Sequence, residues 1–228
     1  LMDVSPVTAT GYSLLIVGSA AAFGAYRYYR KGLIDIKAAI VFAIPSIIAV
    51  YATRAFLMPA IPDPVLQSPI IIGKDLAIMV LFAVLMIAAA MMMLRNSKSL
   101  KPPKDKPHHY GLVIIEGAVV GVATGMLGAG GGFLIIPALV LLMGMPMKEA
   151  VGASLFIIAL KSLIGFIGDI QSGIEFQFTM LALFFVATFA GMWAATIVSH
   201  RFDGQKLQQA FAYFTLLVAA LILLKEFT

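Results

Sequence analysis

A glycine-rich break in an apolar segment is the feature of this chain best suited to bind a ligand. Residues 121–137 place six glycines, a threonine and a proline inside an otherwise apolar run. Lipid tolerates an interrupted backbone only where protein or a water-filled cavity satisfies the freed amide and carbonyl groups. A helix starting after Gly132 would turn its free amides and positive dipole end toward an anion. We therefore expect Gly130, Gly131 and Gly132 to lie at an anion site, although close helix packing is the alternative reading of such glycines.

Lys161 is the ionisable side chain most suited to anion binding. It is the fourteenth residue of the apolar segment 148–169, far from either end. An ionisable group near the middle of a bilayer is costly unless it faces a cavity or a partner, so it marks a functional site by default. The alternative is a structural ion pair with a carboxylate such as Glu116. Glu116 itself could couple transport to protons, or it could reach the aqueous boundary from its helix end.

Hydroxyl groups and one arginine complete the set of candidate ligands. Ser13 and Ser154 occupy matching positions in two similar segments, and each could donate a hydrogen bond to an anion, with Thr8 and Thr10 extending the polar surface. Serine in a membrane helix also commonly bonds its own backbone. Arg54 is expected in the outer third of its segment, where it attracts anions, extends toward the membrane surface or pairs with Asp63.

Composition identifies an integral membrane protein. The 228 residues are 61% hydrophobic and 12% charged, with a mean hydropathy of +1.01, against roughly half apolar and a quarter charged in a soluble domain. The net charge of +5 comes from basic residues in short loops, which the positive-inside bias explains better than a nucleic-acid partner. The chain has no cysteine, which excludes disulfides and thiolate metal sites.

The apolar segments predict an all-α, multi-pass architecture in the cell membrane. The expected segments are 6–27, 33–57, 70–94, 111–127, 131–144, 148–169, 174–199 and 204–225. The pair flanking the glycine break is short and is expected to span poorly or to form a re-entrant hairpin. Linker 95–109 carries five basic residues against one acidic residue, so we expect it to be cytoplasmic. The basic segments 27–31 and 200–206 fall on the same side.

An internal repeat divides the chain into two halves. A shift of 141 residues aligns Ala9-Thr10-Gly11-Tyr12-Ser13-Leu14 with Ala150-Val151-Gly152-Ala153-Ser154-Leu155, and seven identities fall in the window 9–32. We expect a first repeat at 1–94, the basic linker at 95–109 and a second repeat at 110–228. The topology makes the halves inverted, as in many secondary transporters. The first half has no counterpart of the glycine-rich pair, so we expect about 30 residues to be absent from it.

The motifs together resemble a known transporter family. Gly-x-x-x-Gly-Met-Leu-Gly-Ala-Gly-Gly-Gly-Phe-Leu-Ile-Ile-Pro-Ala-Leu (121–139), followed by Gly144-Met145-Pro146 and by the motif at 150–155, resembles the signature of the TauE/SafE family of sulfite and sulfonate exporters. The resemblance implies a carrier of small anions, among them sulfite, sulfonates and sulfoacetate.

Two other functions stay open at this stage. An anion channel fits the same sequence features, whereas an intramembrane enzyme is less favoured because no His-x-x-x-His or paired-Asp motif occurs within the apolar segments. No cofactor or metal is expected. The substrate, its direction, a coupled proton or ion, and assembly into a homo-oligomer are not specified by the sequence.

Overall fold

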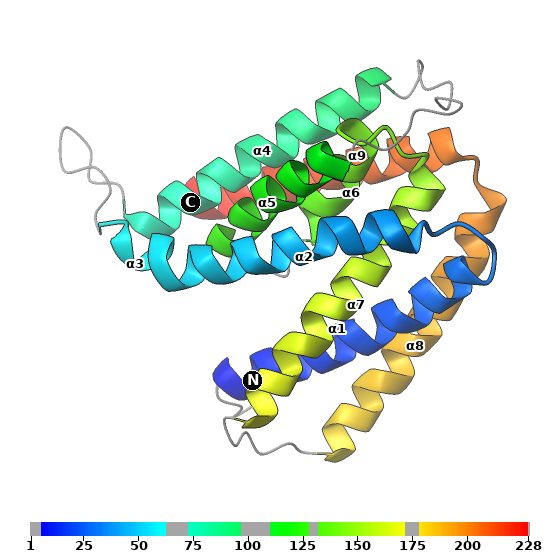
Figure 1. The fold of residues 1–228 in the computed structure, drawn as a ribbon, viewed down its shortest axis with the longest axis horizontal. Helices are drawn as coiled ribbons and strands as arrows, with labels where there is room; N and C mark the ends of the chain where they lie inside the picture. Colours follow the sequence, from blue (N-terminus) through cyan, green and yellow to red (C-terminus); the bar gives the residue numbers. More distant parts are fainter. Residues whose placement is uncertain (1–5, 63–72, 97–109, 128–131, 172–177, 228) are drawn as a thin grey trace.

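The computed structural model describes residues 6–62, 73–96, 110–127, 132–171 and 178–227, and these residues form helices joined by short turns (Figure 1). At several helix ends it describes the backbone only. The elements are α1 (Pro6–Tyr29), α2 (Ile36–Ala52), the π-helical turn η1 (Thr53–Leu57), α3 (Met58–Ala60), α4 (Lys74–Asn96), α5 (Tyr110–Leu127), α6 (Gly132–Leu141), α7 (Met147–Gln171), α8 (Phe178–Arg201) and α9 (Gly204–Phe227).

The expected all-α transmembrane fold is confirmed. Each expected apolar segment corresponds to a helix within a few residues. Among the described residues, five helices are long and apolar enough to cross a membrane: 36–60, 76–95, 147–167, 181–198 and 204–226. Many of their large apolar side chains are exposed, for example Leu183 and Val186 on α8. Such exposure suits helices that face lipid rather than water.

The helices form two groups joined by α7 (Figure 1). One group contains α2, α4, α5, α6 and α9, with α2 packed along α5 and α4 along α9. The other contains α1 and α8. Helix α7 packs along α1 and also contacts α2, α6 and α9. The main buried cluster surrounds α6, with Ile135 and Leu139 meeting Met93 of α4 and Ile157 of α7.

Contacts between helices give their relative directions. Gly24 of α1 faces Leu155 of α7 and Leu14 faces Gly165, so these two helices are antiparallel. Helices α4 and α9 are also antiparallel, because the Gln208 side chain donates to the carbonyl of Met93 at 2.9 Å while Ala83 and Ala219 share a cluster further along.

The C-terminal ends of α1, α4 and α8 therefore lie beside the N-terminal ends of α2, α5, α7 and α9, at the right of Figure 1. We call this the basic end and the opposite one the far end. Its described cationic residues are Arg27, Arg30, Lys31, Lys37, Arg95, Lys148 and Lys206. Partial burial, followed by the nearby charges of Arg27 and Lys148, lowers the pKa of Lys31.

Helix α6 covers only part of the depth of the bundle. Its ten residues rise about 15 Å, half of a hydrocarbon core of about 30 Å. It is antiparallel to α7 and reaches it through a turn in which Gly144 adopts a left-handed conformation (φ 66°). The amide of Met145 bonds the carbonyl of Leu139 at 3.0 Å and closes the end of α6. The short helix expected after the glycine break is therefore present.

Three glycines let α5 lie directly against the backbone of α2. A Cβ at Gly117 would be 2.5 Å from the carbonyl oxygen of Phe42, and one at Gly121 would be 2.5 Å from that of Ser46. At Gly125 a Cβ would be 2.8 Å from the Cβ of Thr53. The four-residue spacing on both helices shows that α2 and α5 run parallel. The packing role expected of such glycines thus applies to this surface of α5.

Replacing Gly121 with alanine should push α2 and α5 apart. The new methyl group meets backbone, which cannot rotate away, and overpacking of this kind costs about 1–3 kcal/mol. Gly191→Ala on α8 is the matched control, because a Cβ there has no neighbour within 4 Å and alanine favours a helix by about 1 kcal/mol. Thermal unfolding in detergent should show a lower midpoint for Gly121→Ala and an unchanged or higher one for Gly191→Ala. Equal midpoints would contradict the backbone contact.

Candidate functional site

A hydrogen bond between α7 and α2 is the centre of the candidate site. The Lys161 ammonium donates to the hydroxyl oxygen of Ser46 at 3.1 Å. Ser46 is fully buried, and Lys161 is partly buried. Ser46 lies ten residues, or about 15 Å, into α2 from the basic end, which is mid-depth for a bilayer. The role of Lys161 as an anion ligand stays a prediction, and the structure adds Ser46 as its hydrogen-bond partner.

Helix α2 is regular at its start and irregular around this contact. Asp35 caps it by accepting a hydrogen bond from the amide of Ala38 at 3.0 Å. Pro45 lies inside the helix and supplies no amide to the carbonyl of Val41. The turn Thr53–Leu57 is π-helical, an insertion often found at functional positions. Two departures from α-helical bonding thus flank Ser46.

The Lys161–Ser46 contact lies where the two helix groups begin to diverge. Toward the basic end, α2 and α7 share the buried cluster with Phe42 and Ile157. Toward the far end, Ile48 and Tyr51 of α2 are 63% and 72% exposed, and Ile164 of α7 is 51% exposed. Figure 1 shows α2 and the α1–α7 pair separating in this direction. Lys161 therefore occupies the junction of a packed half and a more open half of the molecule.

Glu116 lies on the basic side of this contact. Glu116 directly precedes Gly117, which packs against Phe42 of α2. Because Phe42 is four residues before Ser46, Glu116 lies about 6 Å nearer the basic end than Ser46 does. Its Oε2 atom is buried and has no hydrogen-bond partner among the described residues. The described part of the chain contains no hydrogen bond from Lys161 to this oxygen.

The structure does not bring Ser13 and Ser154, two of the expected anion ligands, together. Ser154 lies level with Gly24, near the basic end, whereas Ser13 lies beside Leu14, which faces Gly165. The eleven residues from Ser154 to Gly165 separate the two levels by about 17 Å. The hydroxyl of Ser154 donates to the carbonyl of Val151 in its own helix at 2.9 Å, and Ser13 is exposed. Antiparallel packing of α1 on α7 places these matching positions far apart.

The other expected site residues are only partly described. Gly130 and Gly131 lie outside the described residues, and Gly132 is the first residue of α6. Thr8 and Thr10 lie in the first turns of α1, and Arg54 lies in the π-helical turn; their side chains are outside the described part.

Ser46 is the site residue that sequence reasoning missed. The Pro45-Ser46 pair falls in the middle of an apolar segment, and its proline suggests a bend while its serine draws no attention. A hydroxyl in a membrane helix usually bonds its own backbone, so sequence alone gives little reason to select this one. The feature of the sequence that could have pointed to Ser46 is a polar residue directly after a proline inside a predicted helix.

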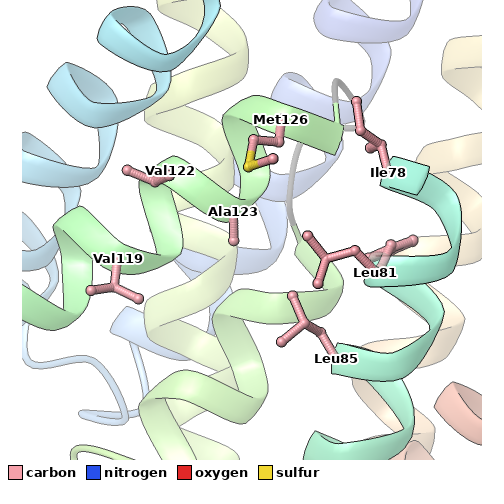
Figure 2. Close-up of a pocket in the computed structure, with 8 residues that line it drawn as sticks. Ile78, Leu81, Leu85, Val119, Val122, Ala123 and Met126 are labelled. Carbon is pink, nitrogen blue, oxygen red and sulfur yellow. The ribbon is translucent and has the colours of Figure 1, made fainter. Parts of the chain in front are cut away.

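Two cavities elsewhere are too apolar to hold an anion. One, of about 320 Å³, lies between α4 and α5 and is lined by Leu81, Leu85, Val119, Val122 and Met126 among others (Figure 2). Another, of about 340 Å³, lies among α1, α2 and α7 beside Tyr26 and Phe156. An anion entering either would lose hydration without gaining polar partners. In the part of the chain that the structure describes, no group of three His, Asp or Glu residues could hold a metal ion.

Comparison with known proteins assigns the chain to a family. The model of the sulfite exporter family TauE/SafE matches residues 1–222. A "Probable membrane transporter protein YunE" of Bacillus subtilis is 27% identical over 216 residues, covering 86% of this chain and 73% of that protein. A "Probable membrane transporter protein" of Xylella fastidiosa is 27% identical over 224 residues, covering 96% and 80%. No solved structure matches the chain. With its apolar helices and the family match over nearly its whole length, this multi-pass membrane transporter belongs to the TauE/SafE family.

Proposed function

We propose that the protein is a secondary carrier of small anions and that Lys161 is its principal anion-binding residue. The observation that carries the proposal is the Lys161–Ser46 hydrogen bond at mid-depth. A cation that donates a hydrogen bond to a hydroxyl there attracts an anion in a medium of low dielectric constant. Lys161 is partly buried and lies where α2 and the α1–α7 pair begin to separate, which supports access from the far end.

Helix α6 supplies the second part of the proposed site. The last turn of α6 lies near the basic end, and Gly132, its first residue, lies about 15 Å from that turn. The first turn of α6 is therefore at a depth similar to that of Ser46. Free amides and the positive dipole end at such a start favour an anion. We therefore assign Gly130, Gly131 and Gly132 to the site, with Glu116 as the candidate group for coupling to protons.

The family points to the substrate class. Its description as a sulfite exporter supports sulfite as the first anion to test, followed by sulfonates and sulfoacetate. The basic end, with seven described cationic residues, is proposed to face the cytoplasm because cytoplasmic loops of membrane proteins carry an excess of Lys and Arg. Transport from the basic end to the far end is then export.

Alternating access around two inverted halves is the proposed mechanism. The antiparallel pairs α1–α7 and α4–α9 support it, because each pairs a helix with its counterpart in the other half. The α1–α8 contact becomes the α7–α2 contact when the halves are exchanged, and both contacts occur. On this proposal the two helix groups change their mutual angle while the anion remains near α7.

Substituting Lys161 with alanine should abolish anion transport without unfolding the protein. Sulfite uptake into liposomes containing the purified protein should fall at least tenfold, because one hydrogen bond from a charged group within the membrane is lost. Lys206→Ala, at an exposed position of the basic end, is the control and should retain uptake. Wild-type uptake by the Lys161→Ala protein, with gel filtration showing both variants folded, would overturn the assignment.

Counterflow should distinguish a carrier from a channel. Liposomes preloaded with unlabelled sulfite should take up labelled sulfite faster than empty ones, because a carrier returns more quickly with substrate bound. Unitary electrical currents in planar bilayers, without acceleration by internal sulfite, would instead identify an anion channel.

The absence of cysteine makes the proposed orientation easy to test. Single cysteines at two exposed described positions, Pro62→Cys at the far end and Gln205→Cys at the basic end, provide the two reporters. In intact bacterial cells a membrane-impermeant maleimide should label the first and should label the second only after permeabilisation. The reverse pattern would contradict a cytoplasmic basic end.

A further inference from the structure

The Ser46 hydroxyl is turned toward another helix instead of its own backbone. The hydroxyls of Thr124, Ser154, Thr196 and Thr215 each donate to a carbonyl three or four residues earlier in the same helix. Ser46 contacts Lys161 on α7. The carbonyl that a Ser46 hydroxyl would reach four residues back belongs to Phe42, and Gly117 of α5 packs on it. Ser46 thus directs its hydroxyl group toward α7 and the proposed anion site.

The chemistry of this hydrogen bond leaves a donor available. An ammonium group has hydrogens and no acceptor, so Lys161 donates and the Ser46 oxygen accepts. The hydroxyl hydrogen of Ser46 is not used in that bond. Lys161 and Ser46 therefore bring a charged N–H donor and a neutral O–H donor within 3.1 Å of each other.

The two residues have no equivalents in the other half of the chain. The 141-residue shift aligns Lys161 with Ala20 and Ser46 with Ala187. Ala20 is buried, so the position of α1 that corresponds to Lys161 is filled by a small, uncharged side chain. A polar pair that the fold does not repeat is better explained by a ligand than by packing.

We propose that Lys161 and Ser46 act as one two-donor unit that binds two oxygens of a single oxyanion. Lys161 donates to one oxygen and Ser46 to another, which gives the site a preference for anions with several oxygens on one centre over a monatomic anion. This inference rests on the proposed function and specifies its substrate class. Ser46 is then an anion ligand as well as the residue that positions Lys161.

The test compares an oxyanion with a halide on the same variant. The purified full chain in liposomes is assayed for sulfite uptake, with methanesulfonate and chloride as competing anions. In Ser46→Ala the half-saturating sulfite concentration and the inhibitory concentration of methanesulfonate should both rise about tenfold, the effect of one lost hydrogen bond to a charged group. The inhibitory concentration of chloride should change less than threefold, because chloride presents one atom to Lys161.

Thr215→Val is the matched control, because it removes a buried hydroxyl that bonds its own helix and keeps the side-chain shape. It should leave all three concentrations unchanged. Equal changes for chloride and methanesulfonate in Ser46→Ala would show that Ser46 only positions Lys161, and this would overturn the two-donor unit. No change for either anion would also overturn it.

The same experiment separates this inference from the proposed function. A wild-type protein that takes up no sulfite would contradict the anion carrier itself. A wild-type protein that carries sulfite, with loss in Lys161→Ala and none in Ser46→Ala, would leave the carrier in place and reject Ser46 as a ligand. If Ser46→Ala does not fold, Ser46→Cys keeps the volume with a much weaker donor and should give the same selective loss.

Discussion

The close approach of α5 to α2 determines the position of the other parts of the candidate site. Within a bilayer, helices gain little from the hydrophobic effect on meeting each other, so direct packing of backbones is the main source of affinity between them. Gly117, Gly121 and Gly125 make this packing through missing side chains. Their contact brings the carbonyls of Phe42 and Ser46 against α5, and the Ser46 hydroxyl faces α7. A bulky residue on α5 would therefore disturb a contact on the opposite side of α2.

Local properties of the sequence were sufficient to predict the helices and to select Lys161 as a candidate. Apolar runs of membrane length give the spans, because each helix satisfies its own backbone whatever its neighbours are. The cost of a charge at mid-depth is likewise a property of one residue in one segment, so Lys161 could be selected without knowing any contact. The short helix after the glycine break was predictable for the same reason, since the length of α6 follows from the apolar run itself.

Properties that depend on packing could not be predicted in this way. Ser13 and Ser154 match in the repeat, but a repeat alignment gives equivalence and not distance, and the antiparallel α1–α7 pair separates the two positions. Ser46 was missed for the opposite reason. Its hydroxyl is unremarkable in its own segment and acquires meaning only from a lysine 115 positions later in the chain. The π-helical turn at Thr53–Leu57 also has no evident signal in its residues.

Helix α7 has a mechanical role that follows from its packing. It is held along one side by α1 and along another by α2, α6 and α9, so it cannot move as a rigid part of either helix group alone. A change in the angle between the groups must bend α7 or slide it along one of its neighbours. Lys161 lies near the middle of this helix, and Gly165 follows one turn later, where a backbone without a side chain yields most easily. The ammonium group of Lys161 is therefore carried by a helix that contacts both groups.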